Sequence, residues 1–223
     1  MGHIKKTEMP TSWPIPRKGK RKRFVAVPSH SGTKGISILF LLRDVLKVTK
    51  TRKEARYMTL GKMVKVNNKI RTDENFPVQV FDSLTLEASD KKDNKNYRLQ
   101  IVNRKFSLIE ISEKEAGTKI VKISGKKSLD KKTVQMNLED GENILTKEKF
   151  FVGDSVVLNT KEDKIEEVLP LKEGAKVEII VGKHAGKKGS LVRFEELVRG
   201  KNYIVKLDDV EVSLPFKSVM VIK

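Results

Sequence analysis

The stretch Thr51-Arg-Lys-Glu-Ala-Arg-Tyr-Met-Thr-Leu-Gly-Lys-Met-Val-Lys-Val-Asn-Asn68 determines the architecture of the first half of this chain. Thr51 followed by Glu54 is a capping box, which predicts a short helix that starts after Thr51. We expect this helix to end at Gly61 as a left-handed stop. Apolar and basic residues then alternate up to Asn67-Asn68, which tolerates the positive φ of a tight turn. The stretch therefore predicts a helix that leads into a β-hairpin.

The residues on either side extend this pattern. From Ile36 to Val48, apolar side chains recur at helical spacing, which predicts one amphipathic helix. After the turn, Lys69-Ile-Arg71 is the returning strand, and further extended segments up to Leu86 surround a turn at Asp82-Ser83. Two helices followed by a basic hairpin are expected to place their cations on a common surface. The N-terminus of the second helix adds backbone N–H donors for phosphate groups. The cations expected to face phosphates here are Arg43, Arg52, Lys53, Arg56, Lys62, Lys65, Lys69 and Arg71.

The beginning of the chain is a basic arm. Residues 1–35 hold nine Lys or Arg against one acid, Glu8, and show no helical or strand periodicity before Phe24. Such a segment is expected to be extended and ordered mainly by its partner. Trp13 either stacks on a base or anchors the arm in the protein's own core, and the sequence favours neither. The arm residues expected to contact phosphates are Arg17, Lys18, Lys20, Arg21, Lys22 and Arg23.

Composition indicates a polyanionic partner. The chain has 47 Lys and Arg against 29 Asp and Glu, which gives a formal net charge of +18. Nucleic acid and anionic membranes are the common partners of such proteins. No apolar stretch of about 18 residues is present, which disfavours the membrane. The absence of Cys excludes disulfides, thiolate nucleophiles and zinc fingers.

The second half is predicted to consist of short strands. Strands are expected at residues 97–102, 106–111, 119–123, 133–138 and 155–158, separated by glycine-containing turns. Their charges alternate in sign, so no contacts are assigned there. The segment Gly174–Val192 then reads as a strand, a glycine-rich basic loop and a second strand, and it resembles the KOW motif of ribosomal proteins and transcription elongation factors. The resemblance implies an SH3-like barrel, a turn at Gly189 where a side chain would clash, and an exposed loop with Lys183, His184, Lys187 and Lys188.

Several motifs together resemble a known family. Thr51–Arg56, Gly61–Asn68 and Asp82–Leu86 resemble the RNA-binding module of bacterial ribosomal protein S4 and several RNA-modifying enzymes. With Trp13–Gly19 in the arm and Phe151–Ser155 in the β region, the whole chain resembles the S4e family of archaeal and eukaryotic small-subunit ribosomal proteins. The resemblance implies an α+β multi-domain protein with a basic arm (1–36), an S4-like RNA-binding domain (37–90), a central β domain (91–170) and a KOW barrel (171–223).

The implied function is that of a cytoplasmic, ribosome-bound structural constituent of the small subunit. It would hold ribosomal RNA through phosphate and sugar contacts, beside neighbouring ribosomal proteins, and so support translation. We expect no catalytic residue, metal, cofactor, membrane or small-molecule substrate. His3, His30 and His184 lack metal-ligand spacing, and the loop at 182–190 fails the nucleotide-phosphate motif because Lys188 follows Lys187.

Two alternatives belong to other functional classes. An enzyme that carries an RNA-binding appendage needs a large α/β catalytic domain, for which residues 91–223 leave no room. A non-ribosomal RNA-binding, transcription or translation factor could use the same modules, but it needs an apolar partner face.

Overall fold

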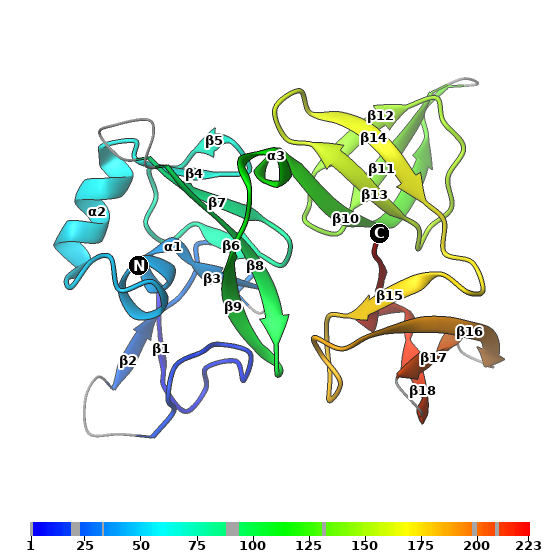
Figure 1. Ribbon diagram of the computed structural model, residues 1–223, viewed down its shortest axis with the longest axis horizontal. Coiled ribbons are helices and arrows are strands. Elements are labelled where there is room, and N and C mark those ends of the chain that lie inside the picture. Colours follow the sequence, from blue (N-terminus) through cyan, green and yellow to red (C-terminus); the bar gives the residue numbers. More distant parts are fainter. Residues whose placement is uncertain are drawn as a thin grey trace. The chain divides into compact units, whose positions relative to one another are not determined.

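The computed structural model describes residues 2–18, 23–32, 34–87, 94–130, 133–197, 200–207 and 210–223. The chain divides into two compact units, Met1–Gly117 and Thr118–Lys223 (Figure 1). The described residues form mostly antiparallel strands, and the longest helix, α2 (Arg52–Leu60), has nine residues. The protein is therefore more strongly β than the expected α+β class.

A five-stranded antiparallel sheet forms the centre of the first unit. Asn67 and Asn68 join two of its strands with φ angles of 51° and 61°, so the predicted hairpin turn is confirmed. After the sheet, α3 (Glu113–Ala116) opens with a capping box made by Ser112 and Glu115. The strands, in the order in which they pair, are β5 (Lys69–Ile70), β4 (Val64–Val66), β7 (Ser83–Leu86), β8 (Lys95–Val102) and β9 (Lys105–Glu110).

The strands predicted at 97–102 and 106–111 belong to this sheet. β8 pairs with β7 in a register that aligns Leu84 with Tyr97, and β9 pairs with β8. Without β8, the free edge of β7 would present unpaired backbone groups. The domain boundary expected at residue 90 therefore lies between two strands of the same sheet. The first compact unit instead ends at Gly117, and the second begins at Thr118.

The single amphipathic helix predicted over residues 36–48 is present only in part. β3 (Gly35–Ser37) pairs with β6 (Pro77–Gln79), and only α1 (Ile38–Phe40) and a π-helical turn, η1 (Leu41–Val45), follow. Every residue from Ile38 to Leu42 is buried. Apolar residues at helical spacing predict one buried face, but the helical segment is shorter than predicted, is π-helical from Leu41 on, and is buried on all sides only in its first part.

Helix α2 begins as predicted and ends differently. The backbone N–H of Glu54 donates to Thr51 Oγ1 at 3.3 Å, which confirms the N-cap. Gly61 has φ −70° and therefore does not form a left-handed stop. Lys62 adopts that conformation instead, with φ 60°. The left-handed residue after the helix is thus one position later in the chain than expected.

The basic arm is folded onto the first unit. β1 (His3–Lys5) pairs with β2 (Phe24–Ala26), and the backbone N–H of Phe106 donates to the carbonyl of Ser12 at 2.8 Å. Trp13 is 1% exposed, and its ring centroid lies 5.4 Å from that of Phe40. Trp13 therefore anchors the arm in the core, and the arm is not a simple extended tail.

The second unit contains two five-stranded antiparallel sheets. The first has its own core around Ile123, Met136 and Val156. Two of its strands, β12 (Asn143–Thr146) and β14 (Lys164–Leu169), were not predicted, because exposed polar residues leave them without a clear apolar pattern. In pairing order the strands are β12 (Asn143–Thr146), β11 (Val134–Leu138), β10 (Thr118–Ser128), β13 (Ser155–Asn159) and β14 (Lys164–Leu169).

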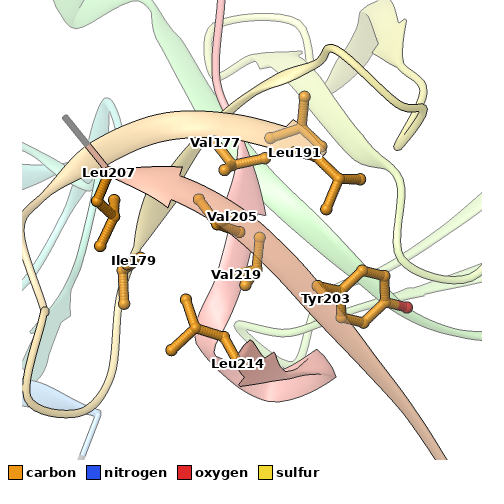
Figure 2. Packing of buried hydrophobic residues seen from close by; sticks show 9 residues of the cluster. Val177, Ile179, Leu191, Tyr203, Val205, Leu207, Leu214 and Val219 are labelled. Carbon is orange, nitrogen blue, oxygen red and sulfur yellow. The ribbon is translucent and has the colours of Figure 1, made fainter. Parts of the chain in front are cut away.

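The second sheet encloses a compact apolar core. Figure 2 shows Val177, Ile179, Leu191, Tyr203 and Val205 among the side chains that converge there. These five side chains are buried, whereas Val181, which follows the strand that carries Val177 and Ile179, is exposed. The elements in pairing order are β18 (Val210–Pro215), β17 (Gly200–Leu207), β16 (Lys188–Leu197), β15 (Lys176–Ile179) and β19 (Val219–Val221), with a 3-10 turn, η3 (Phe216–Ser218), before β19.

A buried lysine joins the two sheets of the second unit. Lys122 on β10 donates from Nζ to the carbonyl of Val219 at 2.7 Å and to the carbonyl of Phe216. Its Nζ also lies 3.7 Å from the centroid of the Phe216 ring. The backbone N–H of Val221 donates to Ser155 Oγ at 3.1 Å. These contacts connect the sheets through specific polar groups as well as through apolar packing.

Candidate nucleic-acid interface

Three of the predicted cations lie free on the surface around α2. Lys53 and Arg56 are exposed on the helix, and Lys62 is exposed in the turn that follows it. Among the described residues, none of these three side chains has a hydrogen-bond or ion-pair partner. Long, unpaired cationic side chains on one surface are suited to phosphate oxygens, because nothing in the protein competes for their charge.

Other predicted cations of this unit are held by the protein itself. Arg52 forms an ion pair with Glu74, and its Nε donates to Glu74 Oε1 at 2.8 Å. Lys65 pairs with Glu87. These partners lie 22 residues away along the chain in both cases. Part of the predicted phosphate surface is therefore neutralised by carboxylates that the fold brings in from later segments.

Two further arginines are half-buried. Arg43 pairs with Asp44 at 2.6 Å and lies 5.4 Å from the centroid of Phe40. Arg71 lies 4.2 Å from the centroid of Phe76, and its buried Nε has no partner among the described residues. Both guanidinium groups are oriented by aromatic rings, which limits their rotamer freedom. Lys69 is also half-buried.

The N-terminus of α2 is capped by side chains of the protein itself. Glu54 Oε2 accepts from the backbone N–H of Lys50 at 2.7 Å, and Glu54 Oε1 accepts from Thr51 Oγ1 at 2.9 Å. The hydrogen bond from the Lys50 backbone, followed by that from Thr51, lowers the pKa of Glu54 below its usual value. Thr51 Oγ1 caps the helix by accepting from the N–H of Glu54, and the Glu54 carboxylate places a negative charge in the first turn. Both features reduce the expected contribution of the N-terminal backbone donors to phosphate binding.

The arm contributes exposed cations to the same unit. Arg17, Lys18 and Arg23 are exposed. Arg17 donates to the carbonyl of Met9, and the guanidinium of Arg23 lies 5.9 Å from the centroid of the Phe24 ring. The predicted contacts at Lys20, Arg21 and Lys22 lie outside the described residues.

The basic loop of the second unit is exposed as predicted. Lys183, Lys187 and Lys188 are exposed, whereas His184 is half-buried. Gly182 and Gly186 take φ angles of 109° and 88°, which only glycine adopts freely. Beneath the loop, burial raises the pKa of Glu178, and the charge of Lys188 opposes that shift. This loop lies in the other compact unit and forms a separate basic group.

Sequence reasoning missed three exposed residues near α2. Lys47 and Lys50 precede the helix and are exposed. Tyr57, on the helix itself, is 71% exposed. The spacing of Lys53 and Tyr57, four residues apart, is a signal that could have identified their shared helix face.

The described residues show neither of two other kinds of site. No helix among them is long and apolar enough to cross a membrane. Within the same ranges, no group of three or more His, Cys, Asp or Glu side chains is placed to hold a metal ion.

Comparisons with known proteins point to one family. Residues 93–165 match the family model described as ribosomal family S4e. The small ribosomal subunit protein eS4 of Methanocella arvoryzae is 33% identical over 85% of this chain and 79% of its own length. The eS4 protein of Pyrobaculum aerophilum is 31% identical over 93% of this chain and 88% of its own length. The crystal structure of 30S ribosomal protein S4e from Thermoplasma acidophilum has the same fold, with a TM-score of 0.71 at 24% identity over 85% of this chain and 95% of that chain.

Proposed function

This chain belongs to the S4e family of small ribosomal subunit proteins, and we propose that it is a structural constituent of that subunit which binds ribosomal RNA. In this role it acts in the cytoplasm as part of the ribosome, supports translation, and catalyses no reaction. The observation that carries the proposal is the group of exposed, unpaired cations Lys53, Arg56 and Lys62 around α2.

The first unit supplies the main RNA-binding surface in this proposal. Its α2 helix, Asn67-Asn68 hairpin and five-stranded sheet support an S4-like RNA-binding module. Side chains with a free charge contact phosphate and sugar groups, which gives affinity and position without reading base sequence. The arm residues Arg17, Lys18 and Arg23 extend this surface, and their charge supports the same role.

The paired cations have a second role in the proposal. Ion pairs hold the side chain of Arg52 against Glu74 and that of Lys65 against Glu87, at the edge of the surface. They contribute less to affinity than the unpaired cations, because the carboxylates already satisfy their charge. Arg43, Lys69 and Arg71 belong to this supporting group.

The second unit supplies a KOW-type barrel with a second basic group. A Cβ at Gly189 would overlap the carbonyl oxygen of Lys206 and lie 2.9 Å from Leu207 Cδ2. This close approach supports the KOW resemblance, in which that glycine is required. The exposed Lys183, Lys187 and Lys188 make the adjacent loop a further phosphate-binding site.

The salt dependence of RNA binding tests the proposal. If six to ten phosphate contacts form together, log affinity for small-subunit ribosomal RNA should fall with log salt with a slope of roughly −4 to −9. A matched control is Lys164→Ala, which removes one charge from an exposed lysine already paired with Glu162 and should leave the slope unchanged. A flat salt dependence of the wild-type protein would contradict the proposal.

A further inference from the structure

An exposed aromatic ring stands on α2 among the free cations. Tyr57 is 71% exposed, and two apolar side chains near it, Val48 and Leu60, are 52% and 57% exposed. Tyr57 and Met58 line a shallow groove together with Val48, Thr49, Lys53 and Glu54. Exposure of large aromatic and apolar side chains to water is unfavourable. A cluster of them on the surface of a ribosomal protein therefore indicates that a partner covers it.

The charge around this ring favours RNA over an apolar protein surface. Lys47, Lys50, Lys53 and Arg56 are exposed and lie before or on α2. The neighbouring acid, Glu54, has both carboxylate oxygens engaged at the helix start. A ring surrounded by cations matches a nucleotide, which presents an aromatic face flanked by phosphates.

We propose that Tyr57 is a stacking platform for an unpaired base of the bound RNA. The inference rests on the proposed function and specifies the kind of nucleotide that this surface takes. Lys53 lies one helical turn before Tyr57 on the same face, so its long side chain reaches the phosphates that flank a base on the ring. In a duplex both faces of each internal base are covered by neighbouring pairs, so the ligand is a base in a loop, a bulge or a single strand.

The test compares two RNA probes with the full-length protein. One probe is a single-stranded oligoadenylate of about 12 nucleotides, and the other is a fully paired RNA duplex of the same length. Affinities are measured by fluorescence anisotropy at one fixed salt concentration for the wild-type protein and for Tyr57→Leu, Tyr57→Phe and Leu60→Ala. Tyr57→Leu keeps an apolar side chain and removes the ring, whereas Tyr57→Phe keeps the ring. Leu60→Ala removes a comparably exposed apolar side chain from the same helix.

Stacking predicts a loss that is specific to the ring and to the single strand. Tyr57→Leu should weaken binding of the oligoadenylate roughly 5- to 100-fold and change duplex affinity by less than about twofold. Tyr57→Phe and Leu60→Ala should stay close to wild type on both probes. Equal losses on both probes, or no loss with Tyr57→Leu, would overturn the stacking role while leaving RNA binding intact. A loss with Leu60→Ala as large as that with Tyr57→Leu would also overturn it, because the effect would then not be specific to an aromatic ring. A wild-type protein that binds neither probe would overturn both this inference and the proposed function.

Discussion

Arg52 donates from Nε to Oε1 of Glu74 at 2.8 Å, and the side chain of Glu74 is only 6% exposed. The other carboxylate oxygen of Glu74 is buried and has no partner among the described residues. Arg52 is therefore the group that compensates a buried negative charge. This role differs from that of Arg56, which is exposed and unpaired one turn later on the same helix.

Replacing Arg52 with Ala should destabilise the first unit. Loss of the guanidinium leaves the Glu74 carboxylate buried without its donor, which costs about 1–3 kcal/mol of unfolding free energy. Urea unfolding of Arg52→Ala measures this cost. Arg56→Ala is the matched control and should stay within about 0.5 kcal/mol of wild type. Equal stability of the two variants would show that the ion pair with Glu74 contributes nothing to the fold.

Replacing Lys53 or Arg56 with Ala should weaken RNA binding without unfolding the protein. Each side chain neutralises one phosphate in the proposed complex, so each substitution should reduce the salt slope by roughly 0.7–0.9. The measurement is the affinity for small-subunit ribosomal RNA across a series of salt concentrations. An unchanged slope in the Lys53→Ala, Arg56→Ala double variant would show that these side chains do not contact phosphates.

The amino group of Lys122 should titrate far below an ordinary lysine. Burial lowers its pKa from 10.5 to about 8. An NMR titration of lysine side chains in the wild-type protein should show one group with a midpoint near pH 8. If Lys122 instead titrates with the exposed lysines, its amino group is hydrated in solution.

The same shift predicts how stability depends on pH. Between pH 8 and pH 10.5, the unfolded chain binds a proton at Lys122 that the folded protein has lost, so this residue makes the folded state relatively more stable as pH rises. The unfolding free energy of the wild type minus that of Lys122→Met should therefore increase as pH rises from 8 to 10.5. A difference that is independent of pH would contradict the shifted pKa.

Replacing Gly189 with Ala should disrupt the second sheet of the second unit. The new methyl group would overlap the Lys206 carbonyl oxygen on the neighbouring strand, and backbone atoms cannot move away as a flexible side chain can. We expect a loss of about 1–3 kcal/mol in thermal or urea unfolding. Gly125→Ala in the same unit is the control, because its Cβ would approach only the side chain of Asn137, at 3.4 Å. Wild-type stability of Gly189→Ala would mean that β16 and β17 are not as close as the structure has them.

Local signals in the sequence predicted the local structure well. The Thr51 cap and the Asn67-Asn68 turn depend on neighbouring residues only, and both are confirmed. The sequence did not reveal that β8 extends the sheet of the first unit, because strand pairing depends on free edges that are distant in sequence. The helix predicted over 36–48 is shorter than expected, because residues 35–37 pair with β6, and this long-range pairing cannot be read from local spacing.

The sequence predicted which residue types make up the candidate site, but not which of the cations are free to bind RNA. Sequence identifies which residues carry positive charge, and Lys53, Arg56 and Lys62 are exposed as expected. It does not identify which cations are neutralised, because the carboxylates of Glu74 and Glu87 come from segments 22 residues away.

Sedimentation of the endogenous protein in a sucrose gradient tests the proposed function most directly. The protein should co-migrate with free small ribosomal subunits and with intact ribosomes, and it should remain bound at moderate salt. A protein found only in the free fraction, or with RNA polymerase, would contradict its assignment as a constituent of the small subunit.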